Sequence, residues 1–167
     1  MILAASEPLS DHHLLDHFQC GVGTLDEWLK RRARANQASG ASRTFVACDQ
    51  RQVAAYYALA SGAIAAAYTT GRVRRNMPDP IPVVVLGRLA IDKSLHGQGL
   101  GRALFGDAAR RVLNAADEIG IRAILVHAIS EEAKRFYLAL GFEPSPIEPL
   151  TLMVTLADVR AALASPH

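Results

Sequence analysis

The clearest pattern of hydrophobic and polar positions lies in the middle of the chain. Residues 83–91 are apolar apart from Gly87 and Arg88, and four of them are β-branched, which predicts a strand buried on both faces. Three glycines follow within five residues. Apolar residues then recur at the spacing of one helical face: Ala103, Leu104, Ala108, Val112 and Leu113. The pattern predicts a strand, a glycine-rich turn and a helix that ends near Gly120.

The preceding part of the chain predicts one helix and two longer strands. Thr24 offers an N-cap, Trp28 is expected in the core, and the helix is expected to end near Ser39-Gly40. The other expected elements are an edge strand at Met1–Ala5, a helical turn from Ser10 to Leu15, a strand over Arg43–Cys48, a turn at Asp49-Gln50, a strand from Gln52 to about Ala67, and an exposed loop over Thr69–Pro82. The alanine-rich end of that last strand, residues 63–67, is equally compatible with a helix on propensity alone.

The last third of the chain predicts a further buried strand, over Arg122–Ile129. Ser130 is expected to cap a helix that Gly141 terminates. Residues 142–149 contain three prolines and are excluded from a central strand. A final strand over Leu150–Leu156 and a short helix over Leu156–Ala164 complete an α/β (α+β) fold. The length of 167 residues predicts one domain over 1–167.

The glycine-rich turn is the first candidate for chemistry. Gly97, Gly99 and Gly101 let the backbone approach a bulky ligand, and a helix that starts there presents free N–H groups and its positive dipole end. One interpretation is a pyrophosphate site, and the other is a glycine-rich turn that binds nothing. The turn has no Gly-Lys-Ser/Thr, and it lacks the Gly-x-Gly-x-x-Gly spacing after an early βαβ unit, which disfavours a nucleotide P-loop and a Rossmann site.

The charge is distributed unevenly along the chain. The formal net charge is only +2, yet residues 30–75 hold 9 of the 18 basic residues and one of the 16 acidic ones, Asp49. If these segments meet in the fold, they form the positive face expected of a nucleic-acid-binding protein. The alternative is a solvated basic helix without a partner.

Several classes of protein are disfavoured by the remaining composition. No apolar run is long enough to span a membrane, and the N-terminus lacks the features of a signal peptide. Cys20 and Cys48 have no metal-ligand spacing, so we expect no metal site. Two lone cysteines suit a reducing cytoplasm, although a disulfide between them stays open.

Two motifs resemble the acetyl-CoA elements of the GNAT acetyltransferase superfamily. The run from His96 to Arg102 resembles its Gln/Arg-x-x-Gly-x-Gly/Ala loop, with His96 where Gln or Arg is usual, and Ala133–Phe142 resembles its Phe-Tyr helix ending in Gly-Phe. The resemblance implies a GNAT fold, in which a mixed central sheet, flanked by helices, is splayed at the acetyl-CoA site. It also implies a set of cofactor-binding residues: Leu89, Ala90, Ile91, His96, Gly97, Gln98, Gly99, Leu100, Gly101, Arg102, Ser130 and Phe136.

The same resemblance assigns roles within that set. The backbone of Leu89–Ile91 would pair with the pantetheine arm, and Gly97–Arg102 would donate N–H groups to the pyrophosphate. Ser130 would lie near the cofactor arm. Tyr137 would lie beside the thioester sulfur and protonate the departing thiolate. The alternative for Tyr137 is a packed core tyrosine whose hydroxyl is satisfied elsewhere.

The segments Phe18–Val46 and Leu86–Gly101 resemble one branch of that superfamily, the toxins of bacterial type II toxin–antitoxin pairs. This resemblance implies transfer of acetyl to the α-amino group of aminoacyl-tRNA, which blocks translation in the cytoplasm. It implies a ribbon–helix–helix antitoxin that alone contacts DNA, and a homodimer. The tRNA would lie on a basic face made of these side chains: Lys30, Arg31, Arg34, Arg72, Arg74, Arg75 and Arg88.

No Glu or His stands out as a general base. A lysine amine, with an unperturbed pKa near ~10.4, is mostly protonated at neutral pH, whereas an α-amino group near ~7.7–8.0 is much less so. The protonated amine of an aminoacyl ester is more acidic still, so an acceptor of this kind needs little help from a base. Two other functions stay open: acetylation of a small amine or protein N-terminus, and a GNAT-fold binding module without catalysis, for which the unusual His96 is the only hint.

Overall fold

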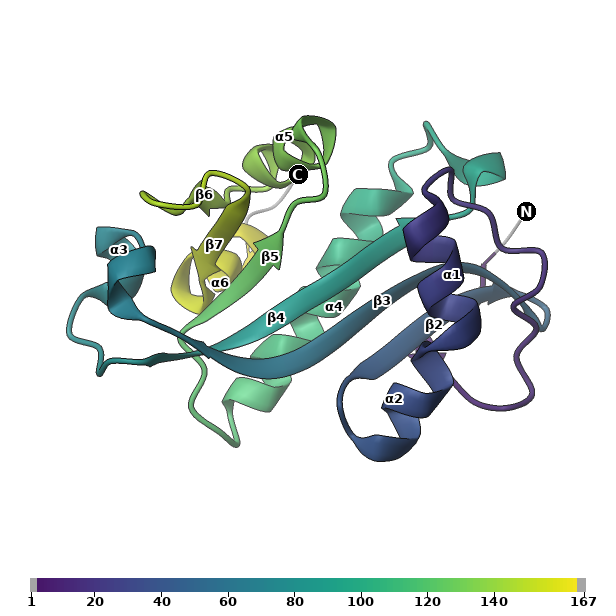
Figure 1. Cartoon of the computed structure of the whole chain (residues 1–167), viewed down its shortest axis with the longest axis horizontal. Helices are drawn as coiled ribbons and strands as arrows, with labels where there is room; N and C mark the ends of the chain where they lie inside the picture. Colours follow the sequence, from purple (N-terminus) through teal and green to yellow (C-terminus); the bar gives the residue numbers. More distant parts are fainter. Residues whose placement is uncertain (1–2, 165–167) are drawn as a thin grey trace. The chain divides into compact units, whose positions relative to one another are not determined.

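The computed structural model describes residues 3–164 of the chain (Figure 1). Seven strands form one mixed sheet in the order β1-β2-β3-β4-β5-β7-β6. Their bounds are β1 Glu7–Pro8, β2 Arg43–Asp49, β3 Gln52–Ile64, β4 Ile81–Ile91, β5 Ala123–His127, β6 Glu143–Pro144 and β7 Thr151–Thr155. The helices are α1 Gly23–Arg31, α2 Ala33–Ser39, α3 Gly71–Arg74, α4 Leu100–Ala116, α5 Glu131–Ala139 and α6 Leu156–Ala164, with short 3-10 turns η1 Ala66–Tyr68 and η2 Lys93–Leu95. None of the helices within residues 3–164 is long and apolar enough to cross a membrane.

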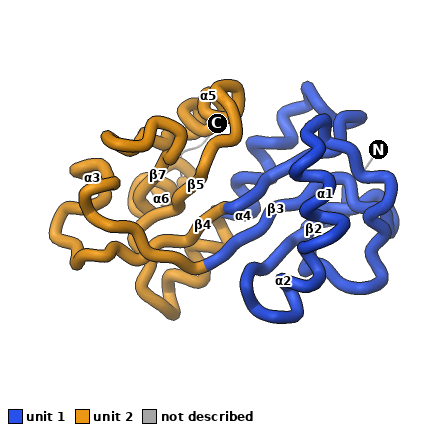
Figure 2. The backbone as a smooth tube through the Cα atoms, in the orientation of Figure 1, with its two compact units in different colours: residues 1–60, 87–108 blue, residues 61–86, 109–167 orange. Residues whose placement is uncertain are grey.

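The chain divides into two compact units (Figure 2). Unit 1 comprises residues 1–60 and 87–108, and unit 2 comprises residues 61–86 and 109–167. Strands β3 and β4 and helix α4 each continue from one unit into the other.

In unit 1, α1 and α2 lie against one face of β2 and β3 (Figure 1). Alternate residues of a strand point to opposite faces. On β2, Val46 therefore packs in the core beneath α1, whereas Ala47 points to the face that α4 covers. On β3, Tyr56 belongs to the first face, and Tyr57 donates a hydrogen bond to Asp107 of α4 on the second.

In unit 2, the pairing of β4, β5 and β7 organises the core. Val83–Val85 pair in parallel with Ala123–Leu125, and β5 pairs antiparallel with β7. The Arg122 guanidinium holds α3 against this sheet, because its Nε and Nη2 donate to the carbonyl oxygens of Val73 and Arg72 at 3.0 and 2.9 Å. Val73 is buried in the same core as Ile81 and Met153.

The structure confirms most of the expected elements and corrects several bounds. Helix α2 ends at Ser39 with Gly40 left-handed at φ 83°, and α5 starts after Ser130 and is followed by Gly141 at φ 101°. The long strand ends at Ile64, because Ala66–Tyr68 turn as a 3-10 helix. Helix α4 ends at Ala116 rather than near Gly120, and the expected loop over 69–82 contains α3 and the start of β4.

Three predictions near the N-terminus are wrong. The expected strand at 1–5 lies partly outside the described residues, and Leu3–Ala5 are not a strand; the ladder with β2 forms only at Glu7–Pro8. Ser10 to Leu15 form a turn rather than a helical segment, because Leu14 within it bridges to Gln52. The prediction that Thr24 is the N-cap of its helix is also wrong.

The helix that contains Thr24 starts two residues earlier than predicted and is interrupted. Val22, in extended conformation, is its N-cap without a side-chain hydrogen bond. The Asp26 carboxylate instead accepts the Cys20 N–H at 2.9 Å, which ties the preceding loop to the first turn. At Arg32, with φ −120° and ψ −30°, the helix breaks into α1 and α2.

Candidate active site

The glycine loop follows β4 through a turn that Asp92 stabilises. The Asp92 carboxylate accepts hydrogen bonds from the Gln19 N–H, the Ser94 N–H and the Ser94 hydroxyl at 2.9, 3.1 and 2.7 Å. Burial would raise the pKa of Asp92, but these hydrogen bonds lower it overall. The turn is therefore fixed by an ionised carboxylate that is already fully engaged by the protein.

The loop itself fits an anionic ligand. Gly97 and Gly99 adopt φ values of 81° and 74°, in the left-handed region that favours glycine. Residues 96–99 are exposed, and α4 begins directly after them and is 17 residues long. Residues 93–106 include no acid. Free N–H groups and the positive end of a long helix thus face outward, as a pyrophosphate site requires.

The His96 side chain forms a hydrogen bond within the protein. Its Nε2–H donates to the carbonyl oxygen of Ile91 at 2.8 Å. The side chain therefore closes the turn between β4 and the loop. It also engages a carbonyl of the Leu89–Ile91 segment, which was expected to pair with the pantetheine arm.

Tyr137 lies on α5 with its ring buried and its hydroxyl uncommitted. The residue is 8% exposed, and its ring packs edge-on against Phe136 and Phe142, with centroid distances of 5.1 and 5.3 Å. Burial raises the pKa of the phenol to about 12. Within residues 3–164 the hydroxyl has no hydrogen-bond partner, which disfavours a core tyrosine satisfied elsewhere. A phenol held neutral in this way carries its proton throughout the neutral pH range.

Ser130 has a structural contact that accounts for it without a ligand. Its Oγ accepts the Ala133 N–H at 3.1 Å, so it is the N-cap of the helix that carries Tyr137. The glycine loop and Leu89–Ile91 belong to unit 1, whereas Ser130, Phe136 and Tyr137 belong to unit 2.

The basic side chains of α1 and α2 divide into free and engaged groups. Lys30 is exposed. Arg31 pairs with Glu27 at 2.5 Å one helical turn earlier. Arg34 donates to the carbonyl oxygen of His13 at 2.5 Å and lies 3.9 Å from Asp11, so it secures the turn at residues 10–13.

The basic side chains around α3 divide in the same way. Arg72 forms a bidentate pair with Asp158 of α6, at 2.6 and 2.5 Å. This hydrogen-bonded pairing raises the pKa of Arg72 and lowers that of Asp158. Arg74 donates to the Thr69 carbonyl oxygen at 2.6 Å, and Arg75 is exposed. Sequence patterns missed Asp158 and Arg122, because neither partner is close in sequence to α3.

Arg88 is the one predicted tRNA contact that is stacked on an aromatic side chain. Its Cζ lies 4.2 Å from the centroid of the Trp28 ring. Burial lowers its pKa, with Tyr56 opposing that shift. Trp28 is buried, which confirms its predicted place in the core.

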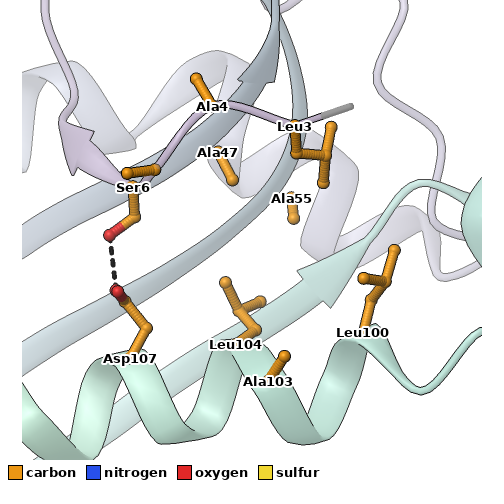
Figure 3. Close-up of a pocket in the computed structure, with 10 residues that line it drawn as sticks. Leu3, Ala4, Ser6, Ala47, Ala55, Leu100, Ala103, Leu104 and Asp107 are labelled. Carbon is orange, nitrogen blue, oxygen red and sulfur yellow. Dashed lines mark hydrogen bonds between the residues drawn. The ribbon is translucent and has the colours of Figure 1, made fainter. Parts of the chain in front are cut away.

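A pocket of about 230 Å³ lies in unit 1, on the face of the sheet that α4 covers (Figure 3). Its lining is mostly small or apolar: Leu3, Ala4, Ala5, Ser6, Ala47, Ala55, Leu100, Ala103, Leu104 and Asp107. The Asp107 carboxylate there accepts hydrogen bonds from Ser6 and Tyr57. Of the predicted cofactor residues only Leu100, the first residue of α4, lines this pocket.

One cluster has the composition of a metal site. Glu7, His12 and His13 place their ligand atoms within 4.8 Å of one another. However, the Nδ1 of His13 accepts the Ser10 N–H at 3.0 Å, so its proton resides on Nε2, which faces Glu7 at 2.5 Å. The cluster is thus organised as a hydrogen-bonded turn, and a metal would have to displace that proton. The cysteines Cys20 and Cys48 are free and buried.

Several known proteins resemble this chain both in sequence and in fold. Residues 40–144 match the family model described as acetyltransferase (GNAT) domain. A tRNA-acetylating toxin of Mycobacterium tuberculosis is 49% identical over 160 residues, covering 96% of each chain. The toxin AtaT complexed with acetyl-methionyl-tRNAfMet has a TM-score of 0.87 at 30% identity, covering 96% of this chain and 99% of AtaT.

A further solved structure is a tyrosine-to-phenylalanine mutant of AtaT bound to the C-terminus of the antitoxin AtaR and acetyl-CoA. It has a TM-score of 0.82 at 30% identity, covering 96% of this chain and 98% of that one. The family match spans more than half of the chain, and the curated relative matches almost all of it. The chain therefore belongs to the GNAT acetyltransferases, in their family of tRNA-acetylating toxins.

Proposed function

We propose that this protein transfers the acetyl group of acetyl-CoA to the α-amino group of aminoacyl-tRNA, which blocks translation until a cognate antitoxin neutralises it. The observation that carries the proposal is the 49% identity to a tRNA-acetylating toxin along nearly the whole of both chains. The exposed glycine loop at the start of α4 and the buried Tyr137 provide the two parts that such a transfer needs.

In the proposed mechanism the backbone of Leu89–Ile91 and of Gly97–Arg102 orients acetyl-CoA, which supplies the thioester that the amine attacks. Tyr137 gives its phenolic proton to the sulfur as the C–S bond breaks. It regains a proton from the ammonium that forms with the new C–N bond. A pKa near 12 keeps this proton on the phenol until the transfer, so Tyr137 is a general acid throughout the neutral range.

The acceptor amine in this mechanism needs no strong base, because an α-amine, and an esterified one still more, is much less protonated near neutral pH than a lysine amine. Electrostatic attraction to tRNA comes from the exposed cations Lys30 and Arg75 and from Arg88. Arg31, Arg34, Arg72 and Arg74 are held by contacts within the protein, so their contribution to tRNA binding is weaker and partly indirect.

The direct test is transfer of labelled acetyl from acetyl-CoA to a pool of charged tRNA, with deacylated tRNA as the control. We expect label only on charged tRNA, and we expect it to leave with the amino acid on treatment with base. Label on small amines or peptide N-termini, without label on charged tRNA, would contradict the proposal.

The partners follow from the same family membership. We propose that the antitoxin contains a ribbon–helix–helix domain and is the sole contact with DNA, that the toxin forms a homodimer, and that it acts in the cytoplasm. We also propose that the two units work as one domain over 1–167, since β3, β4 and α4 run through both. Light scattering of the purified toxin tests the dimer, and a gel-shift assay of toxin alone against the toxin–antitoxin complex tests the DNA contact.

A further inference from the structure

A column of side chains in unit 1 joins helix α1 to the strand that precedes the glycine loop. Trp28 of α1 stacks on Tyr56 of β3, with ring centroids 6.0 Å apart and planes 11° apart. The Arg88 guanidinium covers the Trp28 ring, with its Cζ 4.2 Å from the ring centroid. At the far end of the column, Phe18 packs edge-on against Tyr56 at 5.5 Å.

The column is rigid on its aromatic side. Phe18 and Tyr56 are fully buried, and the Tyr56 hydroxyl donates to the Leu25 carbonyl oxygen of α1 at 2.7 Å. Trp28 therefore cannot rotate without disturbing the contact of α1 with the sheet. A guanidinium stacked on such a fixed ring loses little further freedom when it binds a ligand.

The Arg88 guanidinium, at the end of the column, has no counter-ion within residues 3–164. Arg88 is half-buried, so its charge is only partly solvated, and this burial lowers its pKa. Within residues 3–164 its side chain has no carboxylate partner and no hydrogen bond, whereas Arg31, Arg34 and Arg72 all have a nearby carboxylate. A partly desolvated guanidinium without a counter-ion favours an anionic ligand, and its planar donors match two oxygens of a phosphate.

The position of Arg88 along β4 limits which phosphate this is. It directly precedes Leu89–Ile91, the proposed pantetheine segment, and η2 separates that segment from the glycine loop. The proposed pyrophosphate site thus begins nine residues further on, at Gly97. The other anion that must come near the thioester is on the acceptor: an aminoacyl ester is attached to a terminal ribose, whose nearest phosphate is that of the same nucleotide.

We propose that Arg88 binds the phosphate of the terminal nucleotide of aminoacyl-tRNA and that Trp28 is the positioning residue that holds it there. This inference rests on the proposed function and deepens it. Arg88 thereby aligns the esterified amine with the acetyl donor, which makes it a determinant of productive binding rather than of general attraction to tRNA.

The test uses two small acceptors that differ by one phosphate: an aminoacyl ester of adenosine and the same ester of adenosine 5′-monophosphate, each compared with the aminoacyl-tRNA. The wild-type protein should prefer the phosphorylated ester. Arg88→Ala should raise KM for the tRNA and for the phosphorylated ester by roughly 10- to 100-fold, the effect of losing a charged hydrogen-bond donor. It should leave KM for the adenosine ester and for acetyl-CoA unchanged.

Three further variants distinguish a lost contact between Arg88 and phosphate from a general loss of folding or of positive charge. Arg160→Ala removes the same charge from an exposed site on α6 and should leave all KM values unchanged. Trp28→Phe should raise KM for the phosphorylated acceptors a few-fold, because a smaller ring holds the guanidinium less well. Phe18→Leu perturbs the column where it does not touch Arg88 and should leave the ratio of the two ester KM values at the wild-type value.

Two results are decisive in opposite ways. If Arg88→Ala raises KM equally for both esters, or for neither, the phosphate assignment is overturned while the proposed function stands. If the wild-type protein acetylates neither the charged tRNA nor either ester, the proposed function itself fails.

Discussion

The glycine loop of unit 1 and helix α5 of unit 2 are both expected to serve acetyl-CoA, yet they are built in opposite ways. The loop is exposed, and its shape comes from the left-handed backbone of Gly97 and Gly99. In α5 the backbone is ordinary helix, and the important feature is one buried side chain, Tyr137, held between two phenylalanines.

This difference indicates what each region contributes. A site made of backbone N–H groups tolerates side-chain replacement but not a change of φ. A site made of one buried phenol tolerates nothing that removes its hydroxyl, although the packing depends only on the ring. Substitutions in the loop should therefore act on acetyl-CoA binding, and substitutions in α5 on the chemical step or on the stability of the helix.

The largest effect is expected for Tyr137→Phe. The ring contacts with Phe136 and Phe142 remain, and the lost hydroxyl has no hydrogen bond within the described chain, so stability should hardly change. We expect kcat to fall by roughly 10²- to 10⁴-fold, the usual value of a general acid, with KM for acetyl-CoA near the wild-type value. Single-turnover kinetics and calorimetric titration with acetyl-CoA measure the two quantities.

Tyr68→Phe is the matched control for that variant, because Tyr68 is an exposed tyrosine in the same unit. It should behave as wild type. Full transfer activity in Tyr137→Phe would show that sulfur is protonated by another group, and weak acetyl-CoA binding would show a role in binding instead.

The pH dependence of kcat is a second test of Tyr137. The phenol acts in its protonated form, and its folded-state pKa of about 12 lies above the ordinary value of 10. The acid therefore stays competent as pH rises from 6 to beyond 10, while deprotonation of the acceptor amine accelerates the reaction. We expect an ascending limb and then a plateau to about pH 10; a descending limb between pH 7 and 9 would assign the acid to another residue.

A smaller effect is expected for Gly99→Ala in the loop. A Cβ at this position meets nothing within 4 Å, so the penalty comes only from the φ of 74°, which costs an L-residue about 1–2 kcal/mol. Because the loop is exposed, it can relieve that strain by changing its backbone. We expect a roughly tenfold rise in KM for acetyl-CoA, little change in Tm, and an unaltered kcat at saturation.

Gly23→Ala is the counterpart of this variant. Gly23 also has open space for a Cβ but lies at the start of α1 without a left-handed φ. Its replacement should leave acetyl-CoA binding unchanged. Equal KM values for the Gly99→Ala and Gly23→Ala variants would refute the backbone origin of the site.

A still smaller effect, on stability alone, is expected for Ser130→Ala. The substitution removes the cap of α5 and should cost about 1 kcal/mol, since the Ala133 N–H loses its acceptor. For a chain of this size Tm should fall by roughly 2–4 °C. Ser130→Thr should recover most of the loss. A rise in KM for acetyl-CoA in Ser130→Ala, with Tm at the wild-type value, would support instead the contact with the cofactor arm that the motif implies.

Local patterns predicted the parts of this fold that depend on neighbouring residues. The caps at Ser130 and Gly40 and the apolar run of β4 follow from rules that act within a few positions, and the structure confirms them. In the segment up to residue 24, where three predictions are wrong, long-range contacts decide the conformation. The Ala4 N–H reaches the Cys48 carbonyl oxygen, and Leu14 pairs beside Arg51 and Val53, so the segment follows the sheet rather than its own propensities.

The candidate site shows the same division. The glycine loop could be predicted because three glycines at alternate positions, Gly97, Gly99 and Gly101, indicate its backbone requirement directly. The partners of the basic side chains could not, since Asp158 lies 86 residues from Arg72 and Trp28 is 60 residues from Arg88 by their numbering. A charged residue in a sequence indicates a possible contact with nucleic acid, but only the tertiary structure shows which charges the protein has already paired.

The smallest effect is expected for His96→Ala, which tests the join between β4 and the loop. The variant frees the Ile91 carbonyl oxygen by removing the hydrogen bond from Nε2. If this bond mainly organises the loop, KM for acetyl-CoA should rise a few-fold, in line with about 1 kcal/mol for a neutral hydrogen bond. If the bond instead withholds a carbonyl that the pantetheine arm needs, KM for acetyl-CoA should fall.

His96→Gln, which restores the usual residue of the motif, distinguishes these two outcomes. It should bind acetyl-CoA as well as wild type in the first case and more tightly in the second. We expect the first result, because His96 lies on the exposed side of a turn that Asp92 already fixes, so its bond adds order at little cost to the ligand.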